Sequence, residues 1–275
     1  MSSSSISPQP AEAPARVRRV ALLRTHSCRE PVERAERRVQ EAAGAAGIEL
    51  VPVEEQEPDV VIVLGGDGTM LRALRATLGT GIPVFGVNFG RVGFLTSAPG
   101  DDLDGALERV FAGDFRVVEL STLRARLGAD GHAAINDVVV TSARPGRMVE
   151  LDWELGGERL GRQSCDGMIC CTPSGSTAYN LSNGGPVMMW GLEAMAMTFV
   201  APHALNTRPL VVPRGLDLRV TNRAQEQPVT VLVDGHEVGG LGPESALSVG
   251  VGDETCRLAL LPDVTFFSRY HDVFP

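Results

Sequence analysis

Three glycines surround one carboxylate in the segment Gly65-Gly66-Asp67-Gly68-Thr69, and this spacing suits phosphate chemistry. Glycines let the backbone turn sharply and bring N–H groups close to a bulky anion. Asp67 is the one charged group of this glycine loop, so it is the group there that can accept a proton or hold a cation. A turn in which Asp67 only caps a helix needs a single glycine, so we favour a functional loop.

A predicted strand and a predicted helix position the glycine loop. The unbroken apolar run from Val60 to Leu64 predicts a buried strand that ends at the first glycine. Leu71, Leu74 and Leu78 then recur at helical spacing and predict a helix with these leucines on one face. Because such a helix directs the positive end of its dipole at the loop, the segment predicts an anion site.

Arg24 follows an earlier predicted strand, Val20 to Leu23, and His26 comes two residues later. Ligands of open parallel sheets bind beyond the carboxyl ends of the strands, so both side chains are candidates for contact with phosphates. An ordinary place in a loop is an equally good interpretation of both.

Strands and helices alternate through the first part of the chain. Pro31 opens a predicted helix and Gly47 stops it. Further strands are predicted at 48–53 and 83–87, and a further helix at 103–111. This alternation indicates a doubly wound, mostly parallel sheet, and so an α/β domain over residues 17–115.

Past Gly113 the pattern changes to short strands joined by Gly and Pro turns, without a long helix. Strands are predicted at 117–120, 123–127, 133–141 and 149–155, and strand character returns over 216–261. Val231 to Val233 runs into Asp234-Gly235, a hairpin-type turn. We therefore expect a β-rich, sandwich-like domain over 116–261, and an apolar tail over 262–275 that packs back onto the α/β domain.

Composition excludes several classes of protein. All 25 basic residues are Arg, whereas a Walker A loop requires Lys. A net charge of −9 argues against nucleic-acid binding, and no apolar run approaches the ~20 residues of a membrane span. The 5 cysteines lack paired metal spacing and indicate reduced, mostly buried thiols. Residues 1–16 indicate a disordered leader and not a signal peptide, so we expect a cytoplasmic protein.

The most specific stretch combines Asp166-Gly167 with the run Thr-Pro-Ser-Gly-Ser-Thr-Ala-Tyr at 172–179 and Gly-Gly-Pro at 184–186. Small hydroxyl residues and glycines supply hydrogen bonds around a ribose and an adenine, and one aromatic side chain can cover a base. A surface loop rich in Ser and Gly would not need this order of residues.

Together these motifs resemble the NAD kinase family, over about Val60 to Asp234. Gly-Gly-Asp-Gly-Thr is shared in part with diacylglycerol and sphingosine kinases and more loosely with 6-phosphofructokinases, but the second motif is not expected in them. Asn136-Asp137 falls where the family has Asn-Glu, a pair that grips ribose hydroxyls. Gly93-Phe94-Leu95 is similar to the family's Gly-Phe-Leu, which contacts the dinucleotide; a simple apolar plug is the alternative. Many relatives carry an Arg where this chain has Ser164-Cys165, so a charge partner for a ligand phosphate would come from elsewhere.

The resemblance implies transfer of the terminal phosphoryl group of ATP or polyphosphate to the 2′-hydroxyl of the adenosine ribose of NAD, giving NADP. Asp67 would orient that hydroxyl, accept its proton and help hold Mg²⁺ or another divalent cation. The donor phosphates would be bound by Gly65, Gly66, Gly68, Thr69 and Arg24. NAD would be bound by Gly93, Phe94, Asn136, Asp137, Asp166, Ser174, Thr177, Ala178, Tyr179, Ser182 and Asp234. A homodimer or homotetramer is expected.

Two other functions stay open at this point. A lipid kinase with the same glycine loop would need a membrane-facing surface, and no basic amphipathic helix supplies one. A dinucleotide sensor without turnover would have no use for Asp67. The choice between ATP and polyphosphate, the acceptance of NADH and the number of subunits are also open.

Overall fold

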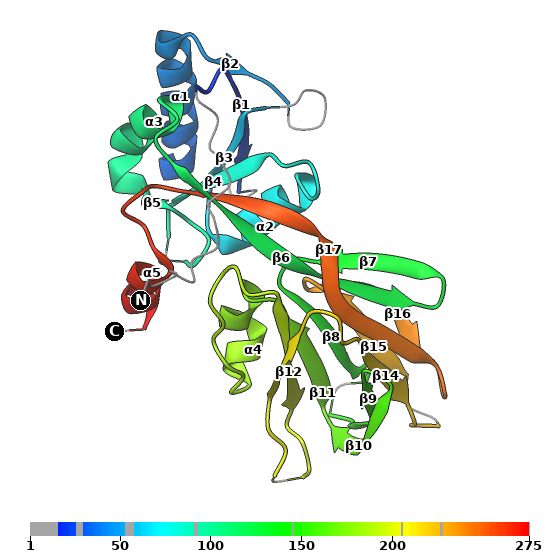
Figure 1. The fold of residues 1–275 in the computed structure, drawn as a ribbon. Helices are drawn as coiled ribbons and strands as arrows, with labels where there is room; N and C mark the ends of the chain where they lie inside the picture. The colour runs from blue at the N-terminus through cyan, green and yellow to red at the C-terminus, as the bar shows by residue number, and fades with distance from the viewer. Residues whose placement is uncertain are drawn as a thin grey trace, which may run out of the picture. The chain divides into compact units, whose positions relative to one another are not determined.

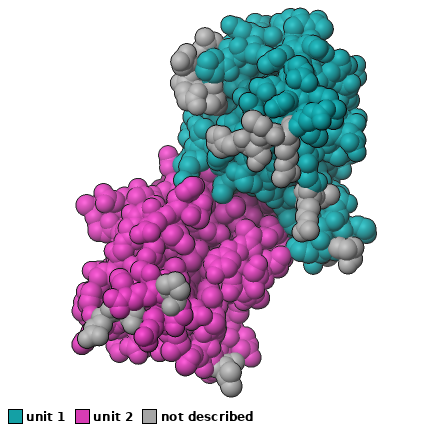
Figure 2. All heavy atoms as spheres, turned by 180° about the vertical axis from the view of Figure 1, so that it is seen from behind, with its two compact units in different colours: residues 1–120, 255–275 teal, residues 121–254 magenta. Residues whose placement is uncertain are grey.

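The computed structural model describes residues 16–25, 30–52, 58–90, 93–144, 146–204, 206–225 and 228–274. The chain folds as two compact units, which Figure 2 shows in different colours: unit 1 comprises residues 1–120 and 255–275, and unit 2 comprises residues 121–254. The chain passes from one unit to the other within two strands, β6 (Arg116–Leu127) and β17 (Ala246–Leu260).

Unit 1 contains a parallel sheet in the order β2, β1, β3, β4. Its strands are β1 (Arg19–Arg24), β2 (Glu49–Leu50), β3 (Val60–Leu64), β4 (Pro83–Asn88) and the short β5 (Ala98–Pro99). The end of β17 adds a further parallel partner, with Arg257 opposite Pro83. The strand order reverses between β1 and β3, and ligands of open α/β sheets bind beside such a reversal.

Helices cover both faces of this sheet. They are α1 (Glu30–Ala46), α2 (Asp67–Ala76) and α3 (Leu103–Phe111), which follows the short η1 (Gly100–Asp102). A further helix of unit 1, α5 (Phe266–Val273), follows β17. Phe85 and Val87 of β4 pack in one cluster with α1 and α3. The intervening Gly86 faces α2, because a Cβ there would lie 2.5 Å from Met70 Sδ. Alternate residues of a strand point to opposite faces, so the doubly wound α/β prediction is confirmed (Figure 1).

Two details of the predicted elements were wrong in unit 1. Helix α2 buries Met70, Ala73 and Leu74, whereas Leu71 is half-buried and Leu78 lies beyond the end of the helix. The close fit of Met70 against Gly86 sets the buried face, and leucine spacing alone does not show it. The strand predicted at 48–53 is described only over Glu49–Leu50, and residue 53 lies outside the described part.

Unit 2 is a sandwich of two sheets, as predicted. One sheet runs β13, β12, β11, β8, β15, β16; the other runs β10, β9, β14, β17 and includes the pair β6 and β7. The bounds are β7 (Asp130–Ala134), β8 (Asp137–Ser142), β9 (Val149–Leu155), β10 (Glu158–Cys165), β11 (Gly167–Cys171), β12 (Ala194–Val200), β13 (Leu210–Pro213), β14 (Leu218–Asn222), β15 (Val229–Val233) and β16 (His236–Leu241). The strand predicted over 133–141 is in fact two, separated at Ile135 and Asn136. In the described residues no helix is long and apolar enough to cross a membrane.

Candidate functional site

The glycine loop of unit 1 joins β3 directly to α2. The Gly65 N–H donates to the Val87 carbonyl at 2.9 Å, and α2 begins at Asp67. A Cβ on Gly65 would lie 2.6 Å from Thr69 Oγ1, so this position has no room for a side chain. A Cβ on Gly68 would meet nothing within 4 Å. The loop is therefore closely packed at Gly65 and Thr69 and open at Gly68.

The Asp67 carboxylate is held by a second loop. Oδ2 accepts the Phe94 N–H at 2.9 Å, and Oδ1 accepts the Leu95 N–H at 3.1 Å. A Cβ on Gly93 would lie 2.1 Å from Oδ1, which explains the glycine there. Both oxygens are thus bound by backbone outside α2, so Asp67 does not cap its own helix. Burial raises the pKa of Asp67, while these two N–H groups and the charge of Arg269 lower it.

The Phe94 ring packs against the C-terminal helix. Its centroid lies 6.0 Å from that of Phe266 and 5.6 Å from that of Phe274. Helix α5 is fixed at its start by a capping box between Thr265 and Ser268. The structure therefore shows Phe94 as a buried support for the loop that holds Asp67. Its predicted contact with the dinucleotide stays a prediction.

Arg24 lies at the end of β1, where its Nε forms an ion pair with Glu36 Oε2 at 3.0 Å. Arg72 of α2, which sequence reasoning missed, donates to the Arg24 carbonyl at 2.8 Å and so ties α2 to the same edge of the sheet. The charge of Arg24 is thus paired with a carboxylate of α1, and its predicted contact with the donor phosphates stays a prediction. His26 lies outside the described residues.

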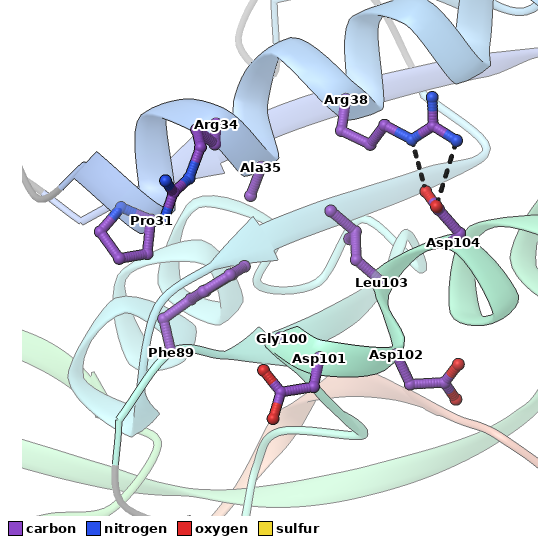
Figure 3. A pocket seen from close by; sticks show the side chains of 10 residues that line it. All are labelled: Pro31, Arg34, Ala35, Arg38, Phe89, Gly100, Asp101, Asp102, Leu103 and Asp104. Atoms are coloured by element: carbon purple, nitrogen blue, oxygen red, sulfur yellow. Dashed lines mark hydrogen bonds and ion pairs between the residues drawn. The ribbon is translucent and has the colours of Figure 1, made fainter.

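A pocket of about 450 Å³ opens between the start of α1 and η1, with Phe89 and Leu103 among its apolar lining residues. Two arginines border it, and Figure 3 shows Arg38 meeting Asp104 along two hydrogen bonds, of 2.7 and 3.1 Å. Arg34 pairs with Glu30 at 2.9 Å. The positive charges of this pocket are therefore already paired with carboxylates.

In unit 2, Asp234 organises the chain between β7 and β8. Its carboxylate accepts the backbone N–H groups of Ile135, Asn136 and Asp137, with a distance of 2.7 Å to Asn136 N. Asp234 has a φ of +47° and Gly235 a φ of +79°, as the predicted hairpin turn requires. Asp234 thus holds the backbone beside Asn136, and its predicted contact with NAD stays a prediction.

Asn136 carries a buried acceptor without a partner. No hydrogen bond reaches its Oδ1 from the part of the chain that the structure describes. Its own carbonyl accepts the Thr172 N–H at 2.9 Å, and a Cβ on Gly175 would lie 2.0 Å from that carbonyl oxygen. The neighbouring Asp137 is buried, and burial together with the nearby charge of Asp234 raises its pKa to about 6. An unpaired buried acceptor suits a ligand hydroxyl.

The Thr172 to Tyr179 motif divides into a buried part and an accessible part. The hydroxyls of Thr172 and Ser174 both donate to the Ile135 carbonyl, at 2.6 and 3.0 Å, and the predicted contact of Ser174 with NAD stays a prediction. Thr177 and Ala178 are half-buried, whereas Tyr179 is 46% exposed. Ser182, at the end of the short α4 (Tyr179–Ser182), is exposed.

Asn180 explains the Gly-Gly-Pro motif and was missed by sequence reasoning. Its buried Nδ2 donates to the carbonyls of Ser176 and Pro186, at 3.1 and 3.0 Å. A Cβ on Gly185 would lie 1.9 Å from Asn180 Oδ1, so the glycine makes room for this side chain. In the sequence, the only signal for this role of Asn180 is the order of residues in the motif.

Asp166 lies apart from these residues. In the register of β11 with β8, Gly167 is opposite Thr141 and Cys171 is opposite Asp137. Asp166 precedes this strand and the Thr172 to Tyr179 motif follows it, so roughly 20 Å of extended chain separates Asp166 from Thr172. Asp166 is exposed, and its predicted contact with NAD stays a prediction.

Comparison with known proteins covers most of the chain. Residues 23–115 match the model of the ATP-NAD kinase N-terminal domain and residues 135–261 that of the ATP-NAD kinase C-terminal domain. The NAD kinase of Heliobacterium modesticaldum is 43% identical over 214 residues, covering 76% of this chain and 76% of the relative. The NAD kinase of Gemmatimonas aurantiaca is 41% identical over 220 residues, covering 77% of this chain and 75% of the relative.

Solved structures share the fold. The yeast NADH kinase complexed with NADH superposes with a TM-score of 0.83 at 19% identity, covering 94% of this chain and 87% of that one. The NAD kinase from Archaeoglobus fulgidus in complex with ATP gives a TM-score of 0.75 at 25% identity, covering 92% of this chain and 99% of that one. By its sequence and its fold, this chain belongs to the NAD kinase family.

Proposed function

We propose that this chain, a phosphotransferase that converts NAD to NADP, uses Asp67 to receive the proton of the attacking 2′-hydroxyl. The observation that carries this role is the fixed carboxylate at the glycine loop, held by the N–H groups of Phe94 and Leu95. A general base works best when its pKa lies near the working pH, and burial moves the pKa of Asp67 in that direction.

The glycine loop supports binding of the donor phosphates. The first N–H groups of α2, beginning with those of Asp67 and Gly68, have no acceptor within the helix and point toward its positive end. Thr69, with its hydroxyl against Gly65, fixes the shape of the loop. We infer that ATP is the donor, since the archaeal relative is described in complex with ATP.

The carboxylate also fits a divalent cation. Each Asp67 oxygen accepts one N–H and keeps a second lone pair. Mg²⁺ is usually held by one or two carboxylates together with substrate phosphates, so Asp67 and the donor phosphates would be its ligands. Bound there, it would neutralise charge on the phosphates during transfer.

The accessible residues of unit 2 support binding of the acceptor. Asn136 Oδ1 is a buried acceptor ready for a ribose hydroxyl, and Asp137 is beside it. The exposed Tyr179 ring offers a surface on which a base can stack. Thr177, Ala178 and Ser182 border the same segment.

We further infer a cytoplasmic homodimer or homotetramer. The described cysteines Cys165, Cys170, Cys171 and Cys256 are all free and buried, as in a reducing compartment. At the edge strand β13, Leu210 and Val211 are 37% and 53% exposed, and such apolar edges are commonly covered by a partner. Light scattering on the purified protein measures the number of subunits.

Purified protein incubated with Mg²⁺, NAD and ATP should form NADP, detected with an NADP-specific dehydrogenase. Parallel reactions with polyphosphate as donor and NADH as acceptor define the substrates. Lack of NADP with both donors, while calorimetry still records NAD binding, would replace the kinase by a dinucleotide sensor.

A further inference from the structure

Arg269 of α5 is a buried cation with an unpaired donor. The residue is 9% exposed, and its Nε has no hydrogen-bond partner among the described residues. The carboxylate nearest to its guanidinium is Asp272 Oδ2, 3.7 Å from Nη1, which is a long ion pair. A guanidinium has five N–H donors, and burying one without an acceptor costs free energy. Such a donor indicates a ligand that supplies the acceptor.

The packing of α5 brings this cation within range of charge attraction to Asp67. Phe266 and Phe274 of the same helix region pack on Phe94, whose N–H holds the Asp67 carboxylate. The attraction between the two charges lowers the pKa of Asp67 and raises that of Arg269. Burial acts in the opposite direction on each group. The two groups form no direct ion pair in the described structure, so the guanidinium keeps donors for another anion.

Two other arginines described in unit 1 are already paired with carboxylates. Arg24 pairs with Glu36 at 3.0 Å, and Arg38 pairs with Asp104 at 2.7 Å (Figure 3). The chain has no Lys, so arginine and histidine side chains are its candidates for neutralising a phosphate. Among the described candidates, Arg269 combines burial, proximity to Asp67 and an unpaired donor.

We propose that Arg269 binds the phosphate chain of the donor and stabilises the charge that develops during transfer. This inference rests on the proposed function. The 2′-oxygen forms a bond to the γ-phosphorus, the bond from that phosphorus to the β–γ bridging oxygen breaks, and its electron pair leaves on ADP. The hydroxyl proton passes to Asp67, while Arg269 stays charged and donates N–H bonds to the phosphate oxygens.

The test is direct binding of ATP and of inorganic triphosphate, measured by calorimetry on Arg269→Met. Methionine fills the space of the aliphatic stem without a charge. Both affinities should fall at least tenfold, and NAD affinity should stay within twofold of the parent. Arg116→Met is the matched control, because Arg116 is a half-buried arginine of unit 1 that donates to the Val264 carbonyl just before α5. It should leave ATP affinity unchanged.

Unchanged ATP and triphosphate affinity in Arg269→Met would overturn the inference, and a lowered melting temperature with unchanged affinity would assign Arg269 to the fold. An equal loss in the Arg116→Met control would also contradict it. If Arg269→Met does not fold, Arg269→Gln is judged by the same measurements. If the parent makes no NADP but its triphosphate binding still depends on Arg269, the proposed function fails and the phosphate site stands.

Discussion

The Asp67 carboxylate lies against the backbone of Gly93, so closely that a Cβ on Gly93 would come within 2.1 Å of Asp67 Oδ1. Asp67 begins α2, which follows β3, whereas Gly93 lies in the segment after β4. The position of the proposed base is thus set by the absence of a side chain 26 residues further along the chain.

Gly93→Ala should lower kcat strongly, because the new methyl group must displace the carboxylate or the loop. A misplaced catalytic group costs about 10²-fold. Gly44→Ala is the control: a Cβ there meets nothing within 4 Å, and alanine in a helix is favoured over glycine by roughly 0.5–1 kcal/mol. Equal turnover of Gly93→Ala and the parent would show that the position of Asp67 does not matter.

Asp67→Asn should lower kcat by roughly 10²–10⁴-fold, because an amide cannot accept the hydroxyl proton. The amide offers one acceptor, so one of the N–H groups of Phe94 and Leu95 also loses its partner, and the melting temperature should fall modestly. In the parent, kcat/KM should decrease as the pH falls through the raised pKa of Asp67, and the variant should lack this decrease. A variant with near-parental turnover would make Asp67 structural.

Tyr179→Ala should raise the apparent KM for NAD with little effect on the melting temperature, since the side chain is 46% exposed. Loss of one stacked base costs about 1–3 kcal/mol. Leu160→Ala, at a similarly exposed apolar position on β10 (45%), should leave the KM unchanged. Calorimetric NAD binding equal to the parent's would exclude Tyr179 from the site.

Asp137→Asn should stabilise the free protein at pH 7–8. The folded pKa of about 6 lies above the ordinary value of 3.8, so the folded state binds this proton more tightly than the unfolded chain. The corresponding stability is present below the ordinary pKa and is lost as the pH rises through about 6. The variant should therefore gain on the order of 2–3 kcal/mol at pH 8 and little at pH 4. Urea unfolding at both pH values measures the difference, and an equal gain at both would attribute it to another cause.

Local signals predicted the elements at the site well. The apolar run Val60 to Leu64 and the glycines after it define β3 and the start of α2, because both depend on neighbouring residues. The prediction of the buried face of α2 was wrong, because that face depends on the fit of Met70 against Gly86 of β4.

The chemical types of the site residues were also visible in the sequence, but their partners were not. The Ser174 hydroxyl donates to the Ile135 carbonyl, 39 residues away in the sequence. The Asp234 carboxylate accepts a run of backbone N–H groups that begins at Ile135, 99 residues away. No spacing rule predicts such pairings. Arg269 was missed for the same reason, because only the packing of α5 brings it near Asp67.

The dependence of the Asp67 loop on α5 has a consequence for synthesis of the enzyme. Chains emerge from the ribosome with the N-terminal part first, and β1, β3 and α2 can associate early. Phe94 finds Phe266 and Phe274 only when the last described helix has been made. A chain interrupted before Thr265 would carry the glycine loop and Asp67 without this support, and would therefore remain a poor catalyst until translation reaches α5.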